Sequence, residues 1–166
     1  IEVVGNVIIK PASMDIVPGP AISGYTLNDG DILHSTPDSK IQFRLIGNGN
    51  QITMSGLSEL RIDCNNRSCE LKLNYGKIFT EVPGSMQNKF TLITNTSEII
   101  LDKNELWITR SIAGKDEVFT IRGPATIIHA GSVEKHIEMG EMLSINSEGE
   151  TATNKIVEKM LPPYIF

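Results

Sequence analysis

Apolar and polar residues alternate with a period of two along most of the chain, a pattern typical of β-strands with one buried face. The alternation is clear over residues 41–45 and recurs as far as residues 143–145. The apolar positions that it assigns to inner faces are Ile41, Phe43, Leu45, Ile52, Met54, Leu60, Ile62, Leu71, Leu73, Ile78, Phe90, Leu92, Leu106, Ile108, Phe119, Ile121, Leu143 and Ile145. The pattern therefore predicts an all-β protein.

Turn-forming residues separate the predicted strands at intervals of roughly eight to twelve residues. Clear examples are Asn28-Asp29-Gly30, Gly47–Asn50, Pro83–Ser85 and Gly123-Pro124. Each strand–turn unit offers only two or three inward side chains, so a core forms only if many units stack. This rhythm indicates a twisted β-solenoid-like or sandwich-like stack of short antiparallel strands, and alternation alone does not separate these two architectures.

The C-terminal residues depart from this pattern. Apolar residues share one face of a predicted short helix over residues 154–161, at Ile156, Val157, Met160 and Leu161. We therefore expect a β domain over residues 1–150, followed by a short helix and an apolar tail over residues 151–166. Because an apolar terminus is usually docked, the tail is a candidate for packing on this domain, or for contact with another domain or a partner, through Tyr164, Ile165 and Phe166.

The composition fits one folded domain. The chain has 166 residues, of which 40% are hydrophobic and 21% are charged. Its longest apolar runs, such as Ile99-Ile100-Leu101, are far shorter than the roughly 20 residues of a membrane-spanning helix, so we expect no membrane span in this chain. The net charge of -5 and the scattered 15 Lys and Arg residues argue against nucleic acid as a partner. No signal segment or Met precedes Ile1, so we expect a processed protein or an excised domain.

The two cysteines, Cys64 and Cys69, flank four polar residues between two predicted strands. This spacing favours a disulfide across a hairpin, which would stabilise the fold by about 2 kcal/mol. The alternatives are a pair of free thiols, or a metal site that would need two further ligands absent from the local sequence. A disulfide would imply an oxidising compartment.

Motifs for catalysis or cofactor binding are absent from the sequence. The histidines His34, His129 and His136 lie far apart and form no metal-ligand spacing. We interpret Gly47–Asn50 as a hairpin turn rather than a phosphate-binding loop. The acidic residues near Gly30 and Gly140 are interpreted as turn residues rather than paired catalytic carboxylates or calcium ligands. We therefore predict no enzyme, no catalytic residue, no metal and no cofactor.

Trp107, the single tryptophan, lies between Leu106 and Ile108. By alternation it points away from the face that those two residues bury, so it is a candidate for contact with a partner. An aromatic ring and acidic turns on a β scaffold also leave open a carbohydrate-binding or adhesive cell-surface module. One tryptophan and three tyrosines are few for a carbohydrate platform.

Short elements resemble, in order, those of the extracytoplasmic domain of the FecR family of signalling proteins. In the first half they are the turn at Gly30-Asp31, the strand over residues 39–45 and the glycine-rich hairpin that leads into residues 51–54. Residues 73–79 and 89–94 resemble the family's "l-x-x-G-x-v" and "f-x-V-x-T" elements.

The resemblance to the FecR domain extends over residues 5–148. Residues 117–145 are similar to the family's closing hairpins through Gly123 and Gly140-Glu141. The chain departs from the family over residues 102–108, where a "G-T-x-F-x-V" strand is usual, so it is identified as a divergent member.

The resemblance implies a twisted, solenoid-like β domain in the periplasm, used for protein contact and free of cofactors. We expect a periplasmic or cell-surface module that binds one or more envelope proteins, either in signalling or as a scaffold for a motor, pilus or secretion complex. Strand edges and loops would provide the contacts. Self-association into a homo-oligomer stays open.

Overall fold

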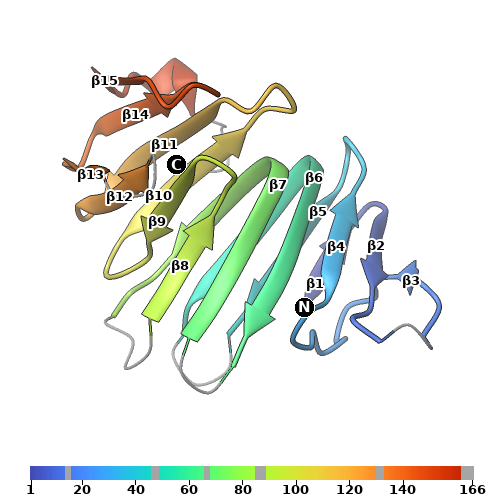
Figure 1. The fold of residues 1–166 in the computed structure, drawn as a ribbon. Coiled ribbons are helices and arrows are strands. Elements are labelled where there is room, and N and C mark those ends of the chain that lie inside the picture. Colours follow the sequence, from blue (N-terminus) through green and yellow to red (C-terminus); the bar gives the residue numbers. More distant parts are fainter. Residues whose placement is uncertain (14–15, 46–48, 66–67, 85–88, 130–132, 162–166) are drawn as a thin grey trace.

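The structure is a computed structural model that describes residues 1–13, 16–45, 49–65, 68–84, 89–129 and 133–161 (Figure 1). It is all-β, as predicted. The strands are β1 Glu2–Val4, β2 Val7–Lys10, β3 Gly19–Pro20, β4 Ile32–Ser35, β5 Lys40–Arg44, β6 Gln51–Cys64, β7 Ser68–Glu81, β8 Lys89–Ile93, β9 Ser97–Ile100, β10 Glu105–Arg110, β11 Asp116–Arg122, β12 Ala125–His129, β13 Val133–Ile137, β14 Glu141–Ile145 and β15 Thr151–Lys155.

The strands form two layers that share the long hairpin β6–β7. Layer A contains, in spatial order, β1, β5, the first half of β6, the second half of β7, β10, β11, β14 and β15. Layer B contains β3, β2, β4, the other halves of β6 and β7, β8, β9, β12 and β13. Both layers follow the sequence along one axis, from the blue to the red end of Figure 1.

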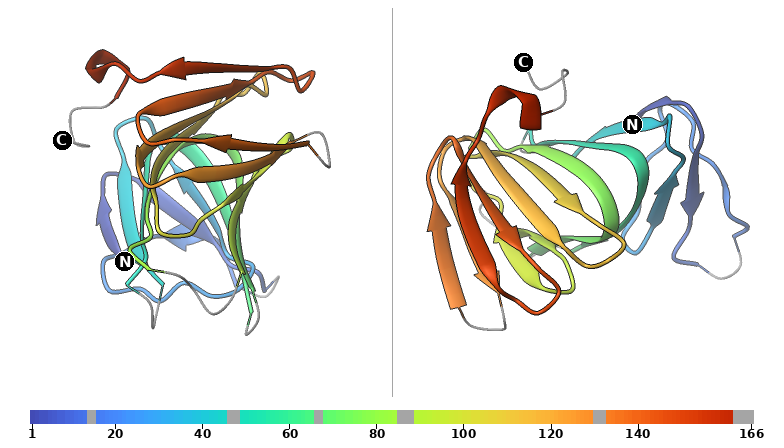
Figure 2. Two further views of the ribbon diagram at one scale, coloured as in Figure 1. Left: turned by 90° about the vertical axis from the view of Figure 1, so that its left-hand side faces the viewer. Right: turned by 90° about the horizontal axis from the view of Figure 1, so that it is seen from above.

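This arrangement combines the two architectures that the sequence left open. The chain alternates between layers in pairs of strands, as a solenoid does, and the inner faces of the layers enclose a sandwich core. All strand pairs are antiparallel except β7 with β8, which are parallel. No described pairing joins the last strands to the first, so the sheet stays open (Figure 2).

The β6–β7 hairpin bends where it passes from one layer to the other. Its register shifts between Ser55 and Glu59, and both Gly56 and Gly76 there have positive φ angles, of 66° and 110°. A Cβ atom at position 76 would collide with the side chain of Ser58, so only glycine allows this close approach. The bend lets one hairpin belong to both layers.

The core lies between the layers and is built from alternate residues of every long strand. Most of these side chains are the ones that the alternation predicted. Fully buried examples are Leu33, Ile41, Ile52, Met54, Leu60, Leu71, Leu73, Ile78, Leu92, Ile99, Leu106 and Ile108. Burial of each such side chain contributes roughly 1.5–3 kcal/mol, and this is the main force that holds the layers together.

The C-terminal residues differ from the prediction. The helix expected over residues 154–161 is reduced to one 3-10 turn, Glu158–Met160. Residues Thr151–Lys155 instead form β15, which pairs with β14 across the expected boundary after residue 150. Eight residues hold too few helical hydrogen bonds to compete with pairing to an adjacent strand. Within the described residues, no helix has the length and apolar character needed to span a membrane.

Candidate interaction surface

An apolar row crosses the outer face of layer A. It consists of Phe79, Trp107, Phe119 and Met142, which lie directly opposite one another on β7, β10, β11 and β14. The residues next to them in sequence, such as Ile78 and Leu106, point into the core. These strands therefore bury apolar side chains on both faces, which is unusual for an antiparallel sheet with one face toward solvent.

The apolar row is covered by the segment that follows β15. Ile156 and Leu161 pack against it, and Ile121 lies beside it. The backbone N–H of Ile156 donates to the carbonyl of Gly140 at 2.8 Å, which continues the β14–β15 pairing. Met160, in the 3-10 turn, is 41% exposed. The cover is therefore short, with few anchors.

A hollow of about 350 Å³ remains beside this cover. Trp107 and Phe119 form its apolar wall, and Met160 and Leu161 form its rim. Its polar lining comes from Lys77, Thr109 and Glu117, which are directly opposite one another in the next row of the sheet. Apolar side chains next to a few polar groups suit a partner's side chain better than they suit bulk water.

Trp107 points to the outer face, as the sequence predicted. It is only 3% exposed, because the ring is packed among Phe119, Met142 and the covering segment, and its contact with a partner stays a prediction. The ring therefore offers no open aromatic platform. Tyr164, Ile165 and Phe166, the other candidates for partner contact, lie outside the described residues.

Alternation gave the wrong face for Phe119 and Ile121. Val118 and Thr120 occupy the core side of β11, so Phe119 and Ile121 point outward. β11 reads Val-Phe-Thr-Ile, in which Phe119 and Ile121 form the more apolar phase, so alternation favours the face that the structure shows to be the outer one. Only the register with Trp107 corrects this assignment.

The outer face of layer B carries many charged side chains beside a few half-buried apolar ones, such as Ile100 and Ile128. Arg61 and Lys72 both pair with Asp63, at 2.7 and 2.8 Å. Lys89 also pairs with Glu98 on this face, and the rings of His34 and His136 lie 3.1 and 3.2 Å from the carboxylates of Glu59 and Glu134. Most of these partners are partly exposed, so each pair is worth only about 0.2–1 kcal/mol.

Two carboxylates on the surface and one tyrosine have shifted pKa values. Burial raises the pKa of Asp63, but hydrogen bonds and charge from Lys72 and Arg61 together outweigh it, so the pKa lies below 3.8. A hydrogen bond from Lys155, with one from the backbone of Glu138, lowers the pKa of Glu141. Burial and then the charge of Glu59 raise the pKa of Tyr75.

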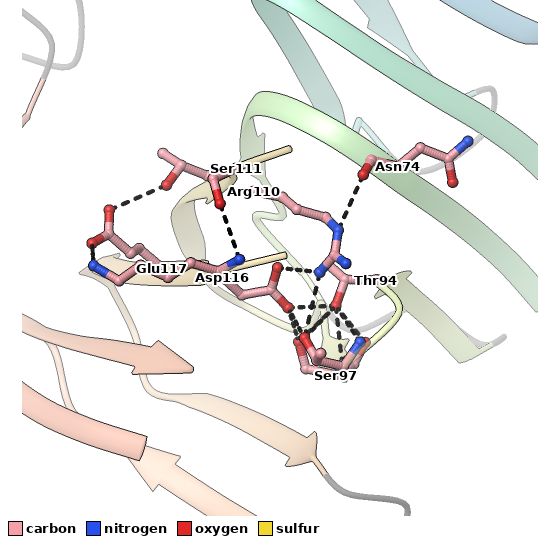
Figure 3. Close-up of polar contacts among 10 residues, drawn as sticks. Asn74, Thr94, Ser97, Arg110, Ser111, Asp116 and Glu117 are labelled. Atoms are coloured by element: carbon pink, nitrogen blue, oxygen red, sulfur yellow. Dashed lines mark hydrogen bonds and ion pairs between the residues drawn. The ribbon is translucent and has the colours of Figure 1, made fainter. Parts of the chain in front are cut away.

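A buried polar cluster closes one end of the core between the layers (Figure 3). Asp116 is fully buried, and one of its oxygens, Oδ1, accepts a hydrogen bond from Arg110 Nη1 at 2.6 Å. The other oxygen, Oδ2, accepts hydroxyl hydrogen bonds from Thr94, Thr96 and Ser97. Asp116 thus ties the β10–β11 turn of layer A to the β8–β9 turn of layer B.

Arg110 extends this cluster to the bend of β7. Its Nε donates to the carbonyl of Asn74 at 3.1 Å, and its side chain is only 5% exposed. A buried carboxylate that is paired and accepts four hydrogen bonds is already satisfied, so this cluster is suited to holding the layers together. His129, opposite Ser97, is buried nearby, and neither of its ring nitrogens has a hydrogen-bond partner among the described residues.

The acidic turn residues have structural partners. Asp31 is buried and accepts the N–H of Asn28 at 2.8 Å, while Asp29 accepts the N–H of Cys64 at 2.7 Å. Glu141 accepts the N–H of Glu138 at 3.0 Å. Within the described ranges, no group of three or more His, Cys, Asp or Glu residues is arranged to hold a metal ion.

The disulfide prediction agrees with the structure. Cys64 and Cys69 are directly opposite each other at the end of the β6–β7 hairpin, and their sulfur atoms are bonded. A disulfide fits an oxidising, extracytoplasmic environment.

Comparisons with known proteins show the fold but no family. No protein-family model matches the chain, and no curated protein matches it. Two crystal structures, at 2.50 and 1.65 Å resolution, of a "putative anti-sigma factor" from Parabacteroides distasonis have a similar fold. Each superposes on this chain with a TM-score of 0.65 and 12% sequence identity. The match covers 75% of this chain and 59% of the Parabacteroides chain. At this identity, the fold is what the two proteins share.

Proposed function

We propose that this chain is a non-catalytic, FecR-like protein-interaction module that acts in signalling across a bacterial cell envelope. Its fold is similar to that of the putative anti-sigma factor from Parabacteroides distasonis. The disulfide Cys64–Cys69 supports a periplasmic or cell-surface location.

The observation that carries this proposal is the apolar row with the hollow beside it. These four large apolar side chains lie in line on the outer face of layer A and are covered only by the short segment that follows β15. Large aromatic side chains in partly covered pockets dominate the free energy of binding at protein interfaces. A partner that inserts one apolar side chain beside Trp107 and pairs with Lys77 or Glu117 would use both the apolar wall and the polar lining.

The test is affinity capture from a bacterial envelope extract, followed by mass spectrometry. Recovery of an outer-membrane receptor is expected for signalling, whereas recovery of a motor, pilus or secretion complex would assign a scaffolding role instead. Recovery of no envelope protein above the level of empty resin contradicts the proposal.

A pair of variants tests whether the partner binds at the hollow on layer A. Thr109→Arg places a long side chain at the hollow, and Thr126→Arg makes the same change on the outer face of layer B. We expect Thr126→Arg to capture as much partner as the unmodified chain does, and Thr109→Arg to capture at least ten-fold less. Equal capture by both variants would show that the partner binds elsewhere.

A further inference from the structure

The sheet has four edge strands among the described residues, and three of them are protected against pairing. β1 has three residues, and β3 consists of Gly19 and Pro20. β13 carries Glu134, Lys135 and His136 in succession. Short strands, proline and charge are the usual devices that stop an edge from pairing with another chain.

β15 is the least protected of the four edge strands. Its five residues, Thr-Ala-Thr-Asn-Lys, include no proline, and the single charge is at the end. Lys155 already pairs with Glu141 of its own chain, at 2.8 Å. β15 is the last strand of layer A, and no described strand lies on its other side.

The printed pairing with β14 fixes which backbone groups of β15 face outward. The N–H of Ile156 donates to Gly140, and the carbonyl of Glu150 accepts from Asn146, so residues 150 and 156 point toward β14. Successive residues of an antiparallel strand point to opposite sides. The N–H and C=O groups of Thr151, Thr153 and Lys155 therefore face the free edge.

This edge is complementary to itself. In antiparallel pairing about Thr153, Thr153 lies opposite its own copy, Thr151 lies opposite Lys155, and Ala152 lies opposite Asn154. All three outward-facing residues then form hydrogen-bonded pairs, giving six N–H···O bonds, and no like charges are opposed. The same register keeps the outer faces of both copies of layer A on one side.

We propose that β15 pairs with β15 of a second copy of this chain, about a two-fold axis at Thr153, to form a homodimer with a continuous layer A. The occupant of the edge is thus this chain itself, and the pairing needs neither the apolar row nor an envelope partner. A single five-residue strand pair buries far less than the roughly 1,200 Å² of a stable interface, so the dimer forms only at high protein concentration.

Disulfide trapping tests the register. The native cysteines are bonded to each other, so a single new cysteine reports on the dimer alone. Thr153→Cys lies opposite itself and is expected to form a covalent dimer at least ten-fold faster than Lys135→Cys, on β13. Ala152→Cys lies opposite Asn154 rather than itself, so it should cross-link far more slowly than Thr153→Cys. Equal rates for all three variants would overturn the proposal.

Sedimentation velocity tests the dimer without cross-linking. The weight-average mass of the unmodified chain is expected to rise toward twice 18.2 kDa with concentration. Thr153→Pro removes an N–H that faces the free edge and spares the pairing with β14, so it should remain a monomer with an unchanged circular dichroism spectrum. A chain that stays monomeric at every concentration, or a proline variant that associates equally well, contradicts the proposal.

Discussion

The outer faces of the two layers are built differently, although the same hairpin contributes to both and both carry exposed ion pairs. Layer B presents charged side chains that pair with one another, such as Arg61 and Lys72 with Asp63. Layer A presents the apolar row, covered by Ile156 and Leu161. The face of layer B is thus complete without a partner, whereas the face of layer A depends on a short segment for its cover.

The contrast indicates which surface residues contribute most to the free energy of unfolding. Exposed ion pairs contribute little, because water and salt screen them. A packed aromatic row contributes through the area that it removes from water, which salt does not weaken. We therefore expect substitutions on the two faces to differ in their effect on unfolding.

The largest expected effect comes from Trp107→Ala, which leaves a cavity in the apolar row. It should lower the free energy of unfolding by about 3–5 kcal/mol in urea titrations. Ile128→Ala, on the outer face of layer B, is the control and should cost about 1 kcal/mol. Similar losses for both would remove the distinction between the faces.

Arg110→Met sharpens the comparison, because it tests whether a buried ion pair contributes more to the free energy of unfolding than an exposed one does. Removing Arg110 leaves Asp116 buried without its cation, so we expect a loss of about 3 kcal/mol. Lys115→Met, which breaks the exposed pair with Glu117, should cost less than about 1 kcal/mol. If both variants unfold at the same denaturant concentration, the buried pair does not hold the layers together.

Reduction of the Cys64–Cys69 disulfide should cost about 2 kcal/mol, because the bond closes only a short loop. The melting temperature is expected to fall by about 4–8 °C while the fold persists. A Cys64→Ser/Cys69→Ser double variant should melt at the same temperature as the reduced protein, and reductant should not change its melting temperature. Two titratable thiols in the untreated native protein would argue against the bond and the extracytoplasmic location.

The smallest expected effect is the change in stability at acidic pH that comes from Asp63. Because the pKa of Asp63 is lower in the folded protein than its ordinary value of 3.8, its stabilising contribution is present above that value. The contribution is lost as the pH falls through the folded pKa, and it amounts to less than about 1 kcal/mol. Asp63→Asn should flatten the stability curve below pH 4 and leave the response to Trp107→Ala unchanged. A variant with the same acid dependence would show that other carboxylates set it.

Alternation predicted most of the fold, because the face to which a strand residue points can be inferred from its neighbours in the sequence. It located Leu71, Ile78 and Leu106 in the core, and it placed Trp107 on the opposite side. The prediction failed where apolar residues follow one another directly and both faces of the strand are covered, as at Val118-Phe119 in β11. Such runs are themselves a signal that both faces of a strand are covered.

The apolar row and the Asp116 cluster could not be predicted, because each depends on register between distant segments. Phe79 and Met142 are 63 residues apart in the sequence, yet only two strands separate them. Asp116 meets Thr94 only because the β8–β9 and β10–β11 turns lie at the same end of the stack. Single-sequence patterns give the faces of strands, not their neighbours.

The progression of strand pairs along one axis has a consequence for how such a domain evolves. Each pair contacts mainly the pairs before and after it, so a β-hairpin gained or lost at the β14–β15 end leaves the bent β6–β7 hairpin and its registers unchanged. Related domains can therefore differ in the number of strands while keeping the same centre.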